Sequence, residues 1–372
     1  MPKWKKMTVG DLCDTISDTY RGDDKDVVLI NTSDVLEGKV LNHQVVENKN
    51  LKGQFKKTFK KNDILYSEIR PANKRYAFVD FGDTDNYIAS TKLMVLRPRK
   101  DVVRPRFLFS FLASKSVLEE LQQLAETRSG TFPQITFSSE LAPTPINVPD
   151  LETQDRIVGI LDVIEGKIST NAEINKNLEQ QTQELFKAWF VTFETFGGKM
   201  PSSWSVAKLG DVATIKTNSF SPAKNPTVML EHYSIPAFDE QKYPVFELAS
   251  NVKSNKYILT DNSVMISKLN PGTKRVWRPM CISEFAVSST EFIIFEANDP
   301  TYKDYVFSVI DSPAFSDWMC AHTTGSTNSR QRTTPSTTLE FQIALPTQEI
   351  VSDFCKIVTP MYDMIEQKTC EN

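Results

Sequence analysis

The chain is an internal duplication in which the second copy follows the first by about 200 residues. Residue identities keep this offset and appear in the same order in both copies. They are Trp4, Gly10, Asp11, Ser67, Pro71, Lys74 and Arg75, matched by Trp204, Gly210, Asp211, Ser267, Pro271, Lys274 and Arg275. Further along, the offset shrinks to 194, where Gln154 is matched by Gln348. Small loop deletions produce such a drift, whereas chance identities do not keep their order, so two related domains account for most of the 372 residues.

Each copy predicts the same order of elements: short strands, a helix, a polar loop and a final apolar strand. Strands are expected at residues 27–30, 64–67, 76–81 and 93–96, and at 257–259, 264–267 and 291–295. Helices are expected at 106–125 and 302–321, polar loops at 126–136 and 322–338, and final strands at 146–149 and 343–346. This pattern predicts an α+β fold class made of two duplicated domains.

A long helix is expected after each copy. Residues 154–193 contain no proline, and their apolar residues are spaced alternately four and three apart, as at the seam of a coiled coil. The second helix has the same spacing, and Pro360 is expected to kink it. The residues expected to pack helix against helix are Ile157, Leu161, Ile164, Ile168, Leu178, Leu185, Val351, Phe354, Val358, Met361 and Ile365, with Asn171, Asn175 and Thr182 at polar seam positions.

The first helix, about 60 Å long, cannot bury its stripe against one small domain alone. We therefore expect the two helices to pack as an antiparallel coiled coil, which gives the chain a pseudo-two-fold organisation. The expected boundaries are 1–150 for the first domain, 151–196 for its helix, 197–346 for the second domain and 347–372 for its helix. Because the second helix is shorter, we expect it to be truncated or to be completed by a partner, including a second copy of this chain.

Charge is distributed unevenly along the chain. The net charge of −4 gives no reason to expect a nucleic-acid partner. Residues 52–75, however, hold eight basic and two acidic residues, and 268–278 hold four basic residues and no acidic one. The helical stretch 150–185 has the opposite balance, with eight acidic and three basic residues. Basic segments in both domains predict contact with the phosphates of a nucleic acid.

The same Lys-Arg dipeptide follows the same proline in both copies, as Lys74-Arg75 and Lys274-Arg275. Arginine can bond guanine with two N–H groups, and lysine can neutralise a phosphate. The polar loops add Arg, Gln, Asn and Thr, which read base edges, although an ordinary flexible loop is the alternative. The residues predicted to bind DNA are Arg70, Lys74, Arg75, Arg128, Thr131, Gln134, Lys268, Lys274, Arg275, Arg278, Asn328, Arg330 and Arg332.

Motifs for catalysis are missing from the sequence. It has no phosphate-binding G-x-x-x-x-G-K-[ST] loop, no dinucleotide G-x-G-x-x-G motif, no Asn-Pro-Pro-aromatic motif and no G-x-S-x-G motif. Asp150, Glu165 and Lys167 resemble a nuclease pattern, whose carboxylates must converge on Mg²⁺. Glu165 and Lys167 are about 200° apart around a helix and cannot converge with Asp150. We therefore expect no catalysis, and expect Asp150 near a helix N-terminus.

Cysteine and histidine usage bounds the compartment and the metal chemistry. Five scattered cysteines form no Cys-x-x-Cys pair, and three histidines lie far apart, so no metal site is expected. Unpaired thiols are typical of a reducing compartment. No apolar run of about 18 residues and no signal-peptide core are present. We expect a cytoplasmic protein with no membrane partner.

This organisation resembles the specificity subunit of Type I restriction–modification enzymes, over essentially the whole chain. The resemblance rests on the order domain, long helix, domain, long helix. It also rests on short signatures: Gly10-Asp11 and Gly210-Asp211 after a Trp, Pro149 with Gln154 and Ile157, Leu-Phe-Lys-Ala-Trp-Phe at 185–190, and Pro201-Ser-Ser-Trp204. The chain departs from the family pattern in its shortened second helix.

The resemblance implies two target recognition domains that read the halves of a bipartite duplex DNA site, held apart by spacer helices. It implies two methylation subunits and restriction subunits as partners, which carry the S-adenosylmethionine, ATP and Mg²⁺ of the complex. This chain is then expected to bind no cofactor or metal. A coiled-coil structural or dimerisation protein with incidental basic loops is the alternative.

Overall fold

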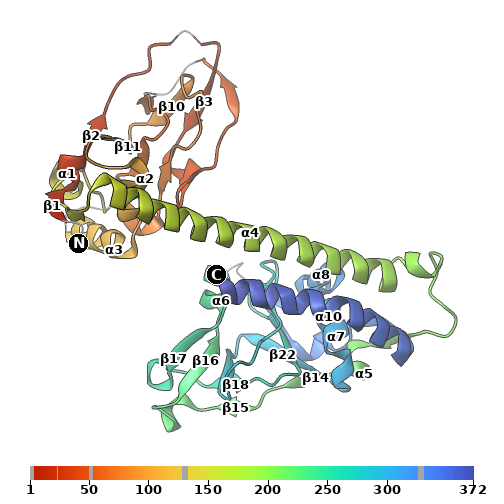
Figure 1. Ribbon diagram of the computed structural model, residues 1–372. Coiled ribbons are helices and arrows are strands. Elements are labelled where there is room, and N and C mark those ends of the chain that lie inside the picture. The colour runs from red at the N-terminus through yellow and green to blue at the C-terminus, as the bar shows by residue number, and fades with distance from the viewer. Residues whose placement is uncertain (1–3, 23, 50–52, 128–132, 326–330) are drawn as a thin grey trace. The chain divides into compact units, whose positions relative to one another are not determined.

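The computed structural model describes residues 4–22, 24–49, 53–127, 133–325 and 331–372 (Figure 1). The chain divides into two compact units, residues 1–165 and 166–372, and each unit holds one copy of the duplication. The division lies inside the long helix α4 (Leu151–Phe190). None of the helices in the described ranges combines the length and hydropathy that a membrane span requires.

The first unit is built on two four-stranded sheets, with strand orders β6-β3-β10-β7 and β2-β11-β8-β9, and on the antiparallel pair β1–β12. Its strands are β1 (Lys5–Thr8), β2 (Cys13–Ile16), β3 (Asp26–Ile30), β4 (Val35–Leu36), β5 (Lys39–Val40), β6 (Val45–Glu47), β7 (Phe55–Lys57), β8 (Ile64–Ser67), β9 (Tyr76–Phe78), β10 (Tyr87–Ser90), β11 (Leu93–Pro98) and β12 (Pro145–Val148). Its helices besides α4 are α1 (Val9–Leu12), α2 (Pro105–Leu112) and α3 (Lys115–Thr127).

Strands β8 and β11 are buried on both faces, which explains why they read as continuous apolar runs. Successive side chains of a strand point to opposite faces. Ile64 and Tyr66 accordingly join a core formed with α2 and α3, whereas Leu65 joins the core formed with β3 and β10. The sheet therefore lies between a helical layer and the other sheet, and the unit has three layers.

The second unit repeats this architecture. Its sheets have the orders β14-β22-β19-β20 and β15-β18-β21-β16-β17, and β13 pairs with β25. Its strands are β13 (Ser205–Lys208), β14 (Ala213–Lys216), β15 (Ser219–Phe220), β16 (Met229–Tyr233), β17 (Val245–Leu248), β18 (Lys256–Ile258), β19 (Ser263–Ser267), β20 (Val276–Trp277), β21 (Ala286–Ser289), β22 (Phe292–Ala297), β23 (Thr323–Thr324), β24 (Arg332–Thr333) and β25 (Gln342–Leu345). Its helices are α5 (Leu209–Val212), α6 (Ile235–Gln241), α7 (Lys303–Asp311), α8 (Pro313–Ala321), α9 (Pro335–Thr338) and α10 (Gln348–Glu371).

The equivalent strands pair alike in the two units. β3 and β10 are parallel in the first, as β16 and β21 are in the second, and the partners of Ser67 and Ser267 are Leu93 and Phe292 at matching positions. The expectation of a mixed α and β chain with two duplicated domains is confirmed.

Two expected helices are each divided in two. Residues 106–125 form α2 and α3, and residues 302–321 form α7 and α8. In the second unit the division follows from Ser312, whose Oγ accepts a hydrogen bond from the Phe315 N–H at 3.2 Å, and from Pro313 at the first helical position. Strands β6, β7, β10, β16, β17 and β21 were not anticipated, because they are short or carry polar residues.

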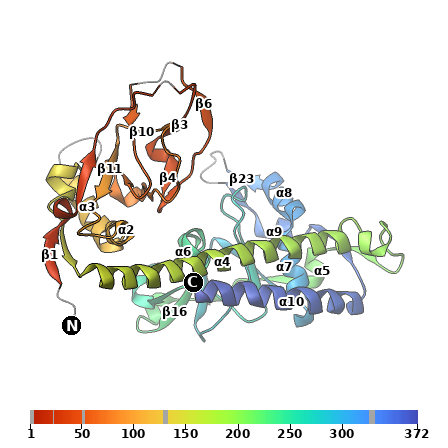
Figure 2. The same cartoon turned by 45° about the horizontal axis from the view of Figure 1, so that its top comes forward.

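Within the second unit, α10 lies alongside the C-terminal part of α4 (Figures 1 and 2). Asn171 donates a hydrogen bond to the Asn372 side chain at 2.9 Å, and Asn175 donates to the Thr369 hydroxyl at 3.1 Å. At the other end of the contact, the rings of Phe190 and Phe354 lie 4.8 Å apart. The two helices therefore run in opposite directions, and α10 continues through Pro360 as one helix.

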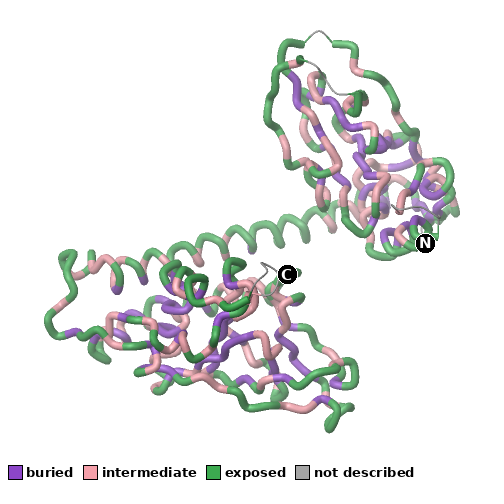
Figure 3. Tube along the Cα trace, turned by 180° about the vertical axis from the view of Figure 1, so that it is seen from behind, coloured by how far each residue is buried: buried purple, intermediate pink, exposed green. Residues whose placement is uncertain are grey.

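The seam residues expected from the sequence occupy different environments. Leu185, Val351, Phe354, Val358 and Ile365 belong to the core of the second unit, whereas Leu178, Met361, Ile157 and Leu161 are half-buried. Ile164 and Ile168 are 50% and 40% exposed, in the exposed middle stretch of α4 (Figure 3). Asn171, Thr182, Phe186, Phe190 and Tyr362 are also buried.

Candidate nucleic-acid interface

In the first unit, two loops that are far apart in the sequence are tied together by main-chain hydrogen bonds. The loop after β8 holds the dipeptide Lys74-Arg75, and the other segment ends the polar loop at residues 133–136. The Arg70 N–H donates to the Pro133 carbonyl at 3.1 Å, and the Ile135 N–H donates to the Glu68 carbonyl at 2.9 Å. The residue between these bonds, Gln134, pairs with Ile69 as an isolated bridge.

The second unit makes the same tie at equivalent residues. The Asn270 N–H donates to the Gln331 carbonyl at 2.9 Å, and the Thr333 N–H donates to the Lys268 carbonyl at 3.1 Å. Arg332 pairs with Leu269, as Gln134 does with Ile69. Both domains thus bring a basic loop and a polar loop to one edge.

The recurring serine and proline shape the basic loop. The Ile69 N–H donates to Ser67 Oγ at 3.0 Å, and Pro71 opens a short 3₁₀ turn. Arg70 has a left-handed backbone with φ of 45°, and its equivalent Asn270 has φ of 49°. Asparagine tolerates this conformation better than arginine does, so Arg70 carries local strain of about 1–3 kcal/mol. Strain of this kind is typical of functional loops.

The Lys-Arg dipeptides are engaged with protein groups. Lys74 pairs with Glu37 at 2.7 Å, and Arg75 donates to the Ser33 carbonyl at 2.9 Å. A pair as exposed as Lys74–Glu37 is weak in water and can be exchanged for a phosphate.

In the second domain, Lys274 pairs with Asp311 at 2.6 Å. Nε and Nη2 of Arg275 both donate to the Asp239 carboxylate, and the Arg275 side chain is only 13% exposed. The Lys274 side chain is 33% exposed and therefore less accessible than that of Lys74, which is 53% exposed.

Arg278 is a correction to the predicted interface. Its side chain is 10% exposed and bonds Asp304 of α7 and both Asp363 and Glu366 of α10. Its hydrogen bonds to these three carboxylates link the end of β20 to α7 and α10 within the second unit. The sequence of residues 268–278, with four basic residues, did not show this difference, because the partners of Arg278 lie far away in the sequence.

The remaining predicted residues divide by accessibility. Arg70 and Arg332 are exposed, and Gln134 and Lys268 are half-buried. Arg128, Thr131, Asn328 and Arg330 lie outside the described residues.

Glu291 is a residue that sequence reasoning missed. Its carboxylate bonds Arg332 with two hydrogen bonds, from Nε at 3.0 Å and from Nη2 at 3.2 Å. The hydrogen bond to Glu291 raises the pKa of Arg332 further. A signal was present, because Glu291 stands where the first copy has Lys92, one residue after the repeated Ser-Thr pair.

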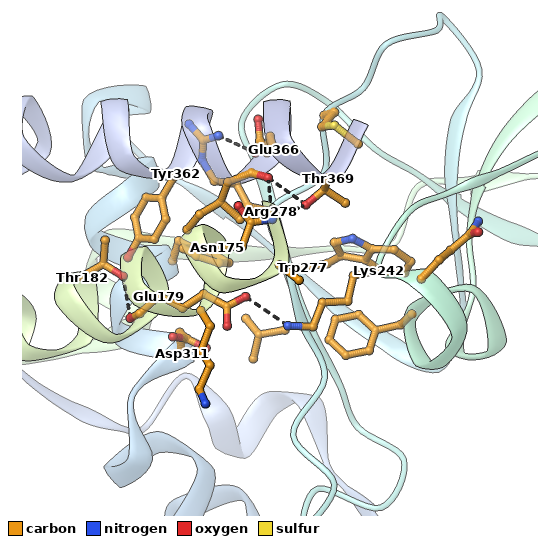
Figure 4. A pocket seen from close by; sticks show the side chains of 18 of the residues that line it. Asn175, Glu179, Thr182, Lys242, Trp277, Arg278, Asp311, Tyr362, Glu366 and Thr369 are labelled. Carbon is orange, nitrogen blue, oxygen red and sulfur yellow. Dashed lines mark hydrogen bonds and ion pairs between the residues drawn. The ribbon is translucent and has the colours of Figure 1, made fainter. Parts of the chain in front are cut away.

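A cavity of about 590 Å³ lies in the second unit between α4, α10 and the recognition domain (Figure 4). Two ion pairs lie among its charged residues: Lys242 with Glu179 at 3.0 Å, and Arg278 with Glu366 at 2.5 Å. Trp277 contributes an aromatic wall. These pairs connect the recognition domain to both helices.

The residues of the nuclease alternative do other work. Asp150 accepts a hydrogen bond from the Thr153 N–H at 2.8 Å at the start of α4, and this bond lowers the pKa of Asp150. Glu165 bonds Arg106, and Lys167 pairs with Glu371 at 3.3 Å. Each side chain therefore has a structural partner of its own.

Comparison with known proteins finds similarity to specificity subunits of Type I restriction enzymes. Residues 1–180 match the family model of the Type I restriction modification DNA specificity domain. The chain is 48% identical over 200 residues to the Type I restriction enzyme HindI specificity subunit of Haemophilus influenzae, covering 54% of this chain and 43% of that subunit. It is 29% identical over 152 residues to the MjaIX specificity subunit of Methanocaldococcus jannaschii, covering 36% of this chain and 34% of that subunit. The match spans less than half the length of these curated relatives.

The fold is also similar to a crystal structure of the S subunit of a Type I restriction–modification system from M. genitalium. The TM-score is 0.59 at 15% identity, over 100% of this chain and 92% of that chain. This likeness concerns the fold alone. The resemblance inferred from the sequence is confirmed for this part of the chain: residues 1–180 match the family of the Type I restriction modification DNA specificity domain.

Proposed function

We propose that this chain is the DNA-reading component of a Type I restriction–modification complex. Each of its two domains reads one half of a bipartite duplex target. The chain performs no catalysis and binds no cofactor; S-adenosylmethionine, ATP and Mg²⁺ belong to two methylation subunits and to restriction subunits that dock on it.

The observation that carries this proposal is the tie between a basic loop and a polar loop, made at equivalent residues in both domains. Two equivalent edges fit a target with two half-sites. Basic side chains supply affinity for phosphates, and polar side chains supply base contacts. The family match of residues 1–180 supports the same function.

We further propose that α10 and the C-terminal part of α4 form an antiparallel coiled-coil spacer. The support is the opposed direction of their contacts and the buried Asn171 and Thr182, since polar seam residues fix the register of coiled coils. The domain boundaries given above, at 150, 196 and 346, belong to this proposal.

Selection of binding sites from a random duplex library tests the function. The chain is copurified with its methylation subunits, and bound duplexes are sequenced at two salt concentrations. We expect a motif of two conserved half-sites separated by unconserved bases, with affinity falling as salt rises. Recovery of no two-part motif from the assembled complex contradicts the proposal.

A structural or dimerisation protein is the second candidate, favoured by one observation. Ile160, Val163 and Ile164 form an apolar stripe on α4 that is 50–73% exposed. An exposed apolar patch marks an interaction surface. Light scattering that finds a stable dimer, together with no salt-dependent DNA affinity of the complex, favours this second function over the first.

A further inference from the structure

Gln134 and Arg332 occupy the same structural position in the two domains. Each lies between the two main-chain hydrogen bonds of the tie, and each forms the isolated bridge to the residue two after the repeated serine. The two residues differ in sequence position by 198, as Leu141 and Leu339 do. A side chain at this position projects from a backbone that the tie holds in both domains, and Arg332 also pairs with Thr324 in the short ladder of β23 and β24.

Arg332 is oriented by its pair with Glu291. The pair engages Nε and one N–H of Nη2, and the Arg332 side chain remains 45% exposed. A guanidinium carries five N–H groups in a rigid plane, so three remain on its outer edge. Two such parallel N–H groups match the O6 and N7 acceptors of guanine. The fixed plane lowers the entropy lost when a base is bound.

The charges around this position are reversed between the domains. The Glu68 N–H donates to the Lys92 carbonyl at 3.0 Å, and the Lys268 N–H donates to the Glu291 carbonyl at 2.9 Å. These equivalent bonds match Glu68 with Lys268, and Lys92 with Glu291. The first domain thus has a lysine where the second has the carboxylate that holds Arg332.

Gln134 fits this altered setting. Lys92 pairs with Glu68 at 3.5 Å, so an arginine at 134 would find a lysine–glutamate pair where the second domain offers Glu291 to Arg332, whereas a neutral amide needs no carboxylate partner. The glutamine amide offers one donor and one acceptor side by side, which match N7 and N6 of adenine in the major groove. In each domain the side chain at this position therefore suits the charge beside it: Arg332 lies beside an acidic residue, and the neutral Gln134 corresponds to a basic one.

We propose that Gln134 and Arg332 are the equivalent base-reading residues of the two domains. Arg332 selects a guanine in one half-site, Gln134 selects an adenine at the corresponding place of the other half-site, and Glu291 is a positioning residue for Arg332. This inference rests on the proposed function and names the base class that each position reads.

The first test substitutes Arg332→Gln in the assembled complex and repeats the duplex selection. We expect the guanine preference at one position of one half-site to be lost, by roughly 5- to 150-fold, with adenine gaining there and the other half-site unchanged. Arg332→Lys keeps the charge but not the paired N–H groups, and is expected to lose most of the guanine preference. Lys356→Ala, at an exposed residue of α10 outside the polar loop, is the control and should leave the motif unchanged.

The second test moves the arrangement between domains. Gln134→Arg combined with Lys92→Glu and Glu68→Lys recreates the second domain's arrangement of Arg332, Glu291 and Lys268 in the first domain. We expect the adenine at the corresponding place to be replaced by guanine, whereas Gln134→Arg alone gives a weaker guanine preference. Glu291→Gln should weaken the guanine preference without changing the salt dependence of binding, which a purely structural role would not do selectively.

Two results overturn the inference. One is an unchanged motif for Arg332→Gln. The other is equal weakening on all sequences with a salt slope reduced by about one, which indicates a phosphate contact. A wild-type complex that selects no two-part motif instead rejects the proposed function, so the two failures are distinguishable.

Discussion

The guanidinium of Arg278 is held by three carboxylates from two helices, and its aliphatic part is buried with it. A buried charge is tolerated when hydrogen-bonded partners surround it, and removing one member leaves the others uncompensated. At the scale of single residues, this cluster connects the second recognition domain to α10.

Arg278→Met is expected to lower the free energy of unfolding of the second unit by about 3–5 kcal/mol, because the buried Asp304 carboxylate loses its counter-ion. Denaturation followed by tryptophan fluorescence measures this change, since Trp277 is the adjacent residue. Lys356→Ala, which removes an exposed pair with Asp353, is the control and should leave stability unchanged. Equal stability of Arg278→Met and the parent chain contradicts the assignment of Arg278 as a structural link.

His232 of β16 is buried, and burial lowers its pKa from 6.5, against the opposing hydrogen bond with Glu247. The unfolded chain therefore takes up a proton near pH 6.5 that the folded chain does not. Stability from this group is present in full above pH 6.5 and is lost as the pH falls below it.

We expect the free energy of unfolding to fall between pH 7.5 and pH 5.5, by at most about 1.4 kcal/mol per pH unit for this group. His232→Gln removes this part of the pH dependence, which urea denaturation at several pH values detects. The exposed His322, changed in the same way, is the comparison. The prediction is contradicted if the pH dependence of the free energy of unfolding is unaltered by His232→Gln but altered by His322→Gln.

The recurring residues of the sequence located the basic loops but not their partners. Ser67, Pro71 and Lys74 recur because they shape and fill one loop, and sequence comparison between the copies detects this. The carboxylates that pair with Lys274 and Arg275 belong to α7 and α6, and no local sequence pattern indicates these ion pairs. Accessibility depends on such long-range pairs, so the predicted list could not separate Arg332 from Arg278.

Helix α4 illustrates, at the scale of elements, how a long helix is started. Asp150 accepts the Thr153 N–H, and the buried Gln154 side chain accepts the Arg104 N–H at 2.7 Å. The first N–H groups of a helix have no partner within the helix, and the Asp150 side chain satisfies one of them. Gln154 instead bonds the Arg104 N–H just before α2, and its counterpart Gln348 is exposed and donates to Asp299 at 3.2 Å.

Asp150→Ala is expected to lower the melting temperature of the chain by a few degrees, because the Thr153 N–H loses its acceptor. Circular dichroism at 222 nm measures the melting of the helix. Asp150→Asn retains an acceptor and should retain most of the stability. The effect is present above pH 3.8 and is lost as the pH falls through the lowered pKa of Asp150. Identical melting of the Ala and Asn variants would falsify the capping role.

The elements that sequence reasoning found are those with a continuous or strongly periodic apolar pattern. β8, β11, β19, β22 and α4 are of this kind. Edge strands such as β6 and β17 were missed because they are exposed on both faces and carry no periodic signal. The helix seam was placed on Ile164 and Ile168 because spacing alone does not say which turns of a stripe have a neighbour.

For the whole molecule, the duplication explains why two units of different sequence have corresponding strand orders, with β15 as an additional edge strand in the second unit. It also leaves an imbalance, since the apolar stripe at Ile160, Val163 and Ile164 is uncovered. Water contact with such a stripe is unfavourable by about 25 cal/mol for each Å² that an association would bury. The free chain is therefore expected to self-associate through it.

Ile160→Gln combined with Ile164→Gln is expected to weaken self-association by roughly tenfold, because it removes apolar area from the stripe. Light scattering over a concentration series measures the association constant. Ser169→Gln, an exposed change on another face of α4, serves as the control. Association that is equally strong in the double variant and in the parent chain locates the contact elsewhere.

The tie that fixes Gln134 and Arg332 uses main-chain groups only. The tie does not depend on the side chain at 134 or 332, so substitution at these two positions costs the fold little. Folding and target choice can then change independently during evolution. A lineage could acquire a new DNA target through one or two point mutations, and each half of the target could drift separately.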